Sequence, residues 1–137
     1  CVSGSLAHGI EERATYVEMA RQICAEYGCK KVASVVRNIS CVERSIWMGM
    51  LFDAESGEHW FSPAHDVHVL EGVAAGDAFN AGLVHALTND FDPQDAVNYA
   101  IAASILKLTI KGDSNLVTAD EIAAVASAAD GGTRVAR

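Results

Sequence analysis

Residues 71–87 read EGVAAGDAFNAGLVHAL, and this stretch decides how the rest of the chain is interpreted. Its first half is rich in small residues. Its second half places Phe79, Leu83 and Leu87 at four-residue intervals, which is the spacing of a buried helix face. The pattern predicts a tight loop followed by a helix from Asp77 to about Leu87. The first amides of such a helix lack partners within the helix, and the helix dipole adds partial positive charge, so the junction suits an anion such as phosphate.

The carboxylate of Asp77 has two interpretations at this junction. Many helices are preceded by small residues and carry an Asp at or near the N-cap, where the side chain simply caps the first turn. Alternatively, the carboxylate faces the bound anion and acts as a base. The loop alone leaves both interpretations open.

Composition places the chain among ordinary globular domains. It has 137 residues, of which 50% are hydrophobic and 20% charged, so residues 1–137 are expected to form a single domain with a real core. The net charge of −8 argues against non-specific binding to nucleic acid, which needs clustered Lys and Arg. No apolar run approaches a membrane span and no leader sequence begins the chain, so we expect a cytoplasmic protein without a membrane partner.

Neither the cysteines nor the histidines form a metal-binding pattern. The four cysteines include no Cys-x-x-Cys pair and no zinc-finger spacing to His, so no structural metal or disulfide framework is expected; they are Cys1, Cys24, Cys29 and Cys41. His65 and His68 are three residues apart in a predicted strand and therefore face opposite ways, which argues against a shared ion. Because the first residue is Cys rather than Met, the chain is expected to begin inside a longer reading frame or to have been processed.

The remaining elements follow from periodicity and turn residues. A helix is predicted from Glu11, with Gly28 as its end and with a buried face at spacings of three and four residues, namely Tyr16, Met19, Ala20, Ile23 and Tyr27. Strands are predicted at 31–36, 44–52, 58–62 and 65–70, with the second and third forming a hairpin and the second buried on both faces. Further helices are predicted from the Asp-Pro pair at 92–93 and, through a capping box, from Thr118. The tail from residue 130 is expected to be irregular.

Two stretches resemble one known family. Residues 76–82, Gly-Asp-Ala-Phe-Asn-Ala-Gly, closely resemble the signature near the C-terminus of the ribokinase-like (PfkB-type) sugar kinases, Asp-Thr-x-Gly-Ala-Gly-Asp-x-Phe-x-x-Gly. Residues 98–117, NYAIAASILKLTIKGDSNLV, look like the following segment of one branch, the 2-keto-3-deoxygluconate kinases. Two matches in the family's order are more specific than either alone.

The resemblance implies a fold and the extent of this chain within it. It implies an α/β fold, namely the C-terminal part of a ribokinase-like three-layer α/β/α domain with a mostly parallel sheet. It covers about residues 10–137, less than half of a complete family member. We therefore expect the C-terminal nucleotide- and phosphate-binding portion of a sugar kinase, without the N-terminal sugar-binding portion.

The resemblance also assigns roles to the loop. The amides of Ala74, Ala75, Gly76 and Asp77 correspond to the family's anion hole, aimed at charge on the γ-phosphoryl group of ATP. Asp77 corresponds to the catalytic base, and the implied cofactors are ATP and Mg²⁺. A free Asp is a weak base near neutral pH, so we expect it to accept the hydroxyl proton while the oxygen attacks.

The chain departs from the family pattern at four positions. Glu71 and Gly72 stand where the family usually has Asp followed by Thr or Arg. Ala74 and Ala75 stand where it has Gly at one or both positions. If either position requires a positive φ, alanine is strained there by on the order of 1 kcal/mol, and the anion hole is expected to be altered.

Two further side chains are candidates for binding. Asp113 lies in Gly-Asp-Ser-Asn, where the 2-keto-3-deoxygluconate kinases carry a similar Gly-Asp-Phe-Asn that the resemblance places near the sugar acid. The alternative for Asp113 is an Asx-type turn between helices. Arg37 aligns with an Arg at the edge of that branch's nucleotide site, and its alternative is a solvated strand end.

These observations give three functional hypotheses. The first is an ATP-dependent kinase of a sugar or sugar acid, with 2-keto-3-deoxygluconate as the acceptor. The second is a truncated, non-catalytic fragment that binds nucleotide or self-associates as a homo-oligomer, because a site divided between two halves of a fold cannot position its reactants with one half missing. The third keeps the kinase and changes the acceptor to another sugar or a nucleoside.

Overall fold

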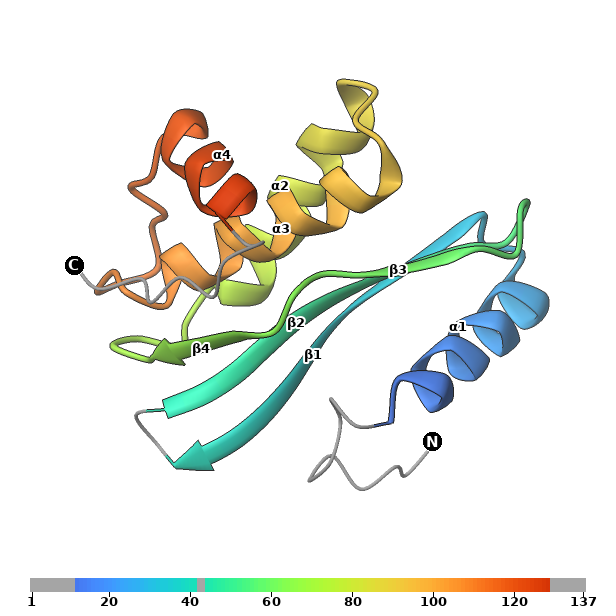
Figure 1. The fold of residues 1–137 in the computed structure, drawn as a ribbon, viewed down its shortest axis with the longest axis horizontal. Helices are drawn as coiled ribbons and strands as arrows, with labels where there is room; N and C mark the ends of the chain where they lie inside the picture. Colours follow the sequence, from blue (N-terminus) through green and yellow to red (C-terminus); the bar gives the residue numbers. More distant parts are fainter. Residues whose placement is uncertain (1–11, 42–43, 129–137) are drawn as a thin grey trace.

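A four-stranded sheet separates two layers of helix, as Figure 1 shows. The structure is a computed structural model that describes residues 12–41 and 44–128. In chain order the elements are α1 (Arg13–Tyr27), β1 (Lys31–Cys41), β2 (Arg44–Asp53), β3 (His59–Phe61), β4 (His65–His68), α2 (Ala75–Thr88), α3 (Pro93–Lys107) and α4 (Ala119–Ser127). The expected start and tail of the chain, residues 1–9 and 130–137, lie outside the described residues.

Strand β2 is the centre of the sheet. It pairs with β1 on one side and with β3 and β4 on the other, and all three pairings are antiparallel. The α/β class is as expected, but the described strands do not form the mostly parallel sheet that the family resemblance implied. Short connections explain the difference, because parallel neighbours need a crossover of about a dozen residues or more, whereas β2 and β3 are joined by a turn with Gly57 at φ 73°.

The two faces of β2 build two separate cores, as its sequence predicted. Trp47 and Leu51 face the layer of α2, α3 and α4. Met48, Met50 and Phe52 face α1 on the opposite side. A strand covered on both faces reads as a nearly continuous apolar run, and β2 is buried from Trp47 to Phe52.

Helix α1 ends as predicted but buries only part of its predicted face, since Ala20 is buried and Tyr16 packs half-buried against the core. Gly28 adopts a left-handed conformation with φ 68°, and its amide donates to the Cys24 carbonyl oxygen. The prediction that Ile23 and Tyr27 are buried is wrong, because both are exposed. The residues that face the sheet are Val17, Ala20 and Cys24. Large side chains from the strands already fill this layer, so the smaller residues of α1 meet the sheet.

Helices α2 and α3 form a closely packed antiparallel hairpin. A Cβ atom on Gly82 would lie 3.0 Å from the Ala103 Cβ and 3.1 Å from the Ala100 Cα, so glycine allows the close approach. Helix α3 is buried around most of its circumference because α2, α4 and the sheet all contact it. This burial includes the whole predicted apolar stripe, which consists of Val97, Ile101, Ile105 and Leu108.

The capping residues predicted for the N-termini of α3 and α4 form their capping hydrogen bonds in α4 but not in α3. Asp92 occupies the N-cap position of α3 with Pro93 after it, but its side chain makes no capping hydrogen bond. The capping box of α4 is complete: the Thr118 hydroxyl accepts from the Glu121 amide, and the Glu121 carboxylate accepts from the Thr118 amide. None of the helices in the described ranges is long and apolar enough to cross a membrane.

Candidate active site

The helix after the small-residue loop begins two residues earlier than predicted. Helix α2 starts at Ala75, with Ala74 as its N-cap, so Asp77 is the third helical residue rather than the first. The first hydrogen bond of the helix runs from the Ala78 amide to the Ala74 carbonyl oxygen, at 2.9 Å. The amides of residues 75–77 therefore precede the regular helical ladder. Ala74 has no side-chain oxygen that could cap them, and no side-chain cap is present.

Ala74 adopts the left-handed conformation that its sequence position suggested. Its φ is 60° and its ψ is 10°, a region that costs an L-residue other than Asn, Asp or Gly on the order of 1 kcal/mol. Ala75 is not among the non-glycine residues with positive φ. The expected strain thus falls on Ala74 and not on Ala75. The backbone at Ala74 adopts the left-handed conformation that glycine usually adopts.

Asp77 presents its carboxylate to the surface in the first turn of α2. The residue is exposed, and no hydrogen bond or ion pair engages its side chain within residues 12–41 and 44–128. Neighbouring Gly76 is also exposed, and a Cβ atom built there would meet nothing within 4 Å. The helix start thus places exposed backbone at Gly76 beside the exposed carboxylate of Asp77, which suits an approaching anion and a hydroxyl group.

Buried hydrogen bonds tie this loop to the far end of α3. The Ser104 hydroxyl, which is fully buried, donates to the Ala75 carbonyl oxygen at 2.9 Å. The amides of Leu70 and Glu71 both donate to the Leu108 carbonyl oxygen, at 2.8 and 3.2 Å. These bonds join residues about 30 to 40 positions apart, and no sequence pattern indicates the role of Ser104.

The same end of α3 carries the loop that contains Asp113. Lys107, the last residue of the helix, is fully buried, and its Nζ donates to the carbonyl oxygens of Ile110 at 3.0 Å and Gly112 at 2.7 Å. Gly112 takes a positive φ of 85°, and Asp113 follows it as an exposed residue. The structure therefore brings the segments of Asp77 and Asp113 to one end of the α2/α3 hairpin.

Arg37 lies elsewhere in the fold. It sits inside β1 rather than at the strand end that was predicted, and it pairs with Trp47 of β2. Its guanidinium carbon lies 5.7 Å from the Trp47 ring centroid, a cation–π contact. The described contacts of Arg37 join it to the sheet and not to the start of α2.

His65, in β4, has an environment that the sequence did not predict. It lies opposite Trp47 in the β2–β4 pairing. Its Nε2 atom is buried and has no hydrogen-bond partner among residues 12–41 and 44–128, and burial lowers the pKa of this imidazole below its ordinary value. Protonation of His65 therefore opposes the folded state.

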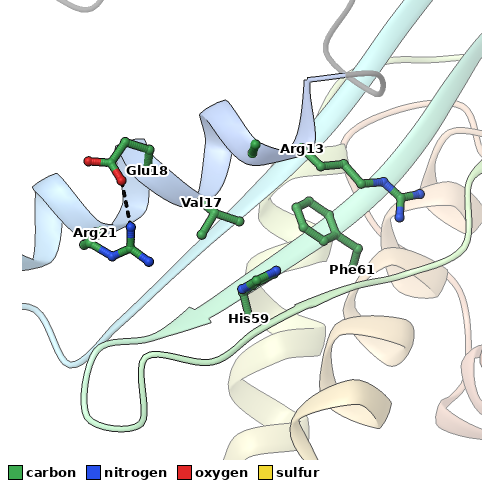
Figure 2. A pocket seen from close by; sticks show the side chains of 7 residues that line it. Arg13, Val17, Glu18, Arg21, His59 and Phe61 are labelled. Carbon is green, nitrogen blue, oxygen red and sulfur yellow. Dashed lines mark hydrogen bonds and ion pairs between the residues drawn. The ribbon is translucent and has the colours of Figure 1, made fainter.

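A pocket of about 550 Å³ lies on the other side of the sheet, between α1 and β3, as Figure 2 shows. Its cationic groups already have partners: the Arg13 guanidinium lies 5.2 Å from the Phe61 ring centroid, and Arg21 pairs with Glu18 at 2.7 Å. Phe61 packs with the α1 core, which places this pocket away from the start of α2.

Fold and site together define an α/β protein in which the last strand of an antiparallel sheet delivers the chain to a helix start with free amides and an exposed carboxylate. The family model of the pfkB family carbohydrate kinases matches residues 48–120, which is more than half of the chain. The chain belongs to the pfkB family of carbohydrate kinases.

Similar solved structures agree with this family. The 2-dehydro-3-deoxygluconokinase of Thermotoga maritima shares 30% sequence identity with a TM-score of 0.82, covering 93% of this chain and 36% of that chain. A PfkB family carbohydrate kinase from Listeria grayi shares 23% identity with a TM-score of 0.75, covering 91% of this chain and 40% of that chain. The chain thus spans well under half the length of these relatives.

Proposed function

We propose that this chain carries the phosphate-binding and catalytic-base part of an ATP-dependent kinase for a sugar or sugar acid, with 2-keto-3-deoxygluconate as the acceptor. The observation that carries the proposal is the start of α2, where an exposed carboxylate at Asp77 stands among first-turn amides with no competing partner among the described residues. The choice of acceptor is supported by the similarity to the Thermotoga maritima 2-dehydro-3-deoxygluconokinase.

In the proposed reaction the acceptor hydroxyl attacks the γ-phosphorus of ATP. The new oxygen–phosphorus bond forms as the bond between the γ-phosphorus and the bridging oxygen breaks, so that ADP leaves. The hydroxyl proton passes to the Asp77 carboxylate. The amides of Ala74, Ala75 and Gly76 face the charge on the transferring group, and the partial positive charge of the α2 N-terminus adds to their effect.

The other two candidates take supporting roles in the proposal. Asp113 is assigned to the acceptor, because its loop is fastened to the same end of α3 as the start of α2. Arg37 is assigned to the nucleotide, on the basis of the family resemblance alone.

Magnesium is assigned to the nucleotide rather than to a cage of protein ligands. Carbohydrate kinases of this family use ATP with a divalent metal, and the described ranges contain no group of three or more His, Cys, Asp or Glu that could hold a metal ion. Mg²⁺ often binds through substrate phosphates, water and only one or two carboxylates. The residues present are compatible with that mode, in which the ion neutralises phosphate charge.

The test is phosphate transfer from ATP to 2-keto-3-deoxygluconate by the purified chain, compared with two Asp→Asn variants. Asp77→Asn should lower turnover by about 100-fold or more, because a positioned general base contributes roughly 10² to 10⁴. Asp95 is the matched control, since it is exposed and is also the third residue of its helix. Asp95→Asn should stay within about twofold of the unchanged protein. Equal turnover by Asp77→Asn and the unchanged protein would remove Asp77 from its role.

A second candidate function is a non-catalytic module that binds nucleotide or self-associates. It is favoured by the 36% coverage of the Thermotoga maritima structure and by exposed apolar side chains in the two loops, among them Val73 (54% exposed) and Leu116 (74% exposed). Where such side chains form a contiguous patch, they mark a surface that binds a partner or ligand. Calorimetric ATP binding without turnover, or a concentration-dependent dimer in light scattering, would favour this candidate over the kinase.

A further inference from the structure

The amino group of Lys107 is buried at a place where the core alone does not require a charge. The residue has 0% relative exposure, and no carboxylate pairs with it within the described ranges. Removing an ammonium group from water is costly, and an apolar side chain of similar volume often serves stability as well or better. A role beyond core packing would explain why a lysine occupies this position.

The partners of the amino group indicate what that role is. Nζ donates to the carbonyl oxygens of Ile110 and Gly112. These two residues belong to the backbone segment just before Asp113. Gly112 is in the left-handed region, so this segment makes a sharp turn that no regular secondary structure maintains. Two charge-assisted hydrogen bonds from one rigidly packed helix end are well suited to hold such a turn.

The hydrogen bonds of the residues next to Lys107 connect the same end of α3 to the loop before α2. Ser104, one helical turn before Lys107, donates to Ala75 at the start of α2. Leu108, the next residue, accepts from the amides of Leu70 and Glu71. The last turn of α3 therefore fastens the loop before α2 on one side and the Asp113 loop on the other.

We propose that Lys107 is a positioning residue of the active site: its buried amino group fixes the Ile110–Gly112 turn and so sets where Asp113 stands relative to the start of α2. The inference rests on the proposed function, which gives Asp113 its ligand. Lys107 itself does not touch substrate, since it is fully buried. It acts through the backbone that carries Asp113.

The first measurement is amide hydrogen exchange on the full chain, which needs no enzymatic activity. Lys107→Met keeps the length of the side chain and removes its donors. It should speed exchange in the 109–114 segment by about tenfold or more, because each hydrogen bond from a charged group is worth roughly that factor or more. Exchange in β2 should remain within about twofold. The matched control is Lys111→Met, an exposed lysine in the same loop, which should change neither region.

Three outcomes of this measurement would overturn the proposal. One is unchanged exchange at 109–114 in Lys107→Met. Another is equal acceleration in β2 and the loop, or unfolding of the variant, which would assign Lys107 to the core as a whole. The third is an equal effect of Lys111→Met. Lys107→Gln, which keeps an uncharged donor, should give an intermediate acceleration of loop exchange, and a loop as fast as that of Lys107→Met would count against the hydrogen-bonding role.

Kinetics separate this proposal from the proposed function. If the chain turns over, Lys107→Met should raise the KM for the sugar acid by about tenfold and lower kcat by a smaller factor, because it displaces an acceptor-binding residue and leaves Asp77 in place. A fall in kcat with unchanged KM would overturn the positioning of Asp113. If the unchanged chain shows no turnover, the kinase proposal fails for this chain, and loop exchange still decides whether Lys107 holds the turn.

Discussion

Replacing Ala74 by glycine should stabilise this protein, although glycine at most positions does the opposite. Ala74 stands at φ 60°, where an L-residue costs about 1 to 2 kcal/mol. Glycine removes that cost. Against it stand about 0.4 to 1 kcal/mol from the greater freedom of glycine in the unfolded chain and about 0.4 kcal/mol for a half-buried methyl group. The net expectation is a gain of about 0.5 kcal/mol in the free energy of unfolding.

The neighbouring alanine provides a control with the opposite sign. Ala75 is helical and only 1% exposed, so Ala75→Gly gains nothing from strain relief. It loses a buried methyl group, worth about 0.8 kcal/mol, and about 0.4 to 1 kcal/mol of unfolded-state freedom. Ala75→Gly should therefore be destabilised by about 1 to 2 kcal/mol. The two variants contain the same substitution at adjacent positions and are expected to differ by about 2 kcal/mol.

Urea unfolding followed by circular dichroism is the appropriate assay, with equal m-values required before free energies are compared. A higher midpoint for Ala74→Gly and a lower one for Ala75→Gly would confirm the reasoning. If both variants lose stability by similar amounts, the left-handed strain at Ala74 is refuted. Because the backbone already turns as glycine would, Ala74→Gly should leave phosphate affinity within about threefold, a change of less than 1 kcal/mol. A larger gain in affinity would show that the alanine distorts the amides.

Three further predictions concern the packing around the site and its pH dependence. Ser104→Ala should lower the free energy of unfolding by about 1 kcal/mol by removing one buried hydrogen bond, and an unchanged urea midpoint would contradict this. Gly82→Val should cost about 1 to 3 kcal/mol because its side chain meets α3, whereas Ala81→Val on the exposed face should cost under about 0.7 kcal/mol; equal losses in thermal unfolding would refute the close contact. Because burial depresses the pKa of folded His65 below its ordinary 6.5, the unfolded state takes up the proton first as pH falls through about 6.5, and stability decreases there until the folded pKa is reached. His65→Gln should flatten this slope in urea titrations between about pH 7 and pH 5, and an unchanged slope would refute the effect of burial on His65.

Local patterns predicted most of the elements because their causes lie close together in sequence. The hairpin of β2 and β3 follows from two strand patterns separated by a turn that contains a glycine. Strand β2 is buried on both faces, as its apolar run indicated. The capping box at Thr118 and Glu121 formed as expected. The left-handed end of α1 at Gly28 is likewise a local effect. Each of these depends on residues within a few positions of one another.

The sequence was less informative where the arrangement of a helix depends on contacts with residues that are distant in the chain. The buried face of α1 depends on the volume of the strand side chains beneath it, so the predicted burial of Ile23 and Tyr27 was wrong. At the start of α2, the Ala75 carbonyl oxygen accepts a hydrogen bond from the Ser104 hydroxyl, which lies 29 positions away. The apolar spacing in these two segments does not predict a hydrogen bond between them.

The loop, the helix and the following segment of a pfkB carbohydrate kinase can be recognised without coordinates, because the glycines, the aspartate and the apolar spacing are properties of neighbouring residues. By contrast, the left-handed strain at Ala74 and the placement of Asp77 and Asp113 at one end of the α2/α3 hairpin become apparent only in the folded chain. This is so because the bonds of Ser104 and Leu108 join segments about 30 to 40 positions apart and depend on how α3 packs in the fold, whereas Lys107 bonds only to backbone three and five positions away.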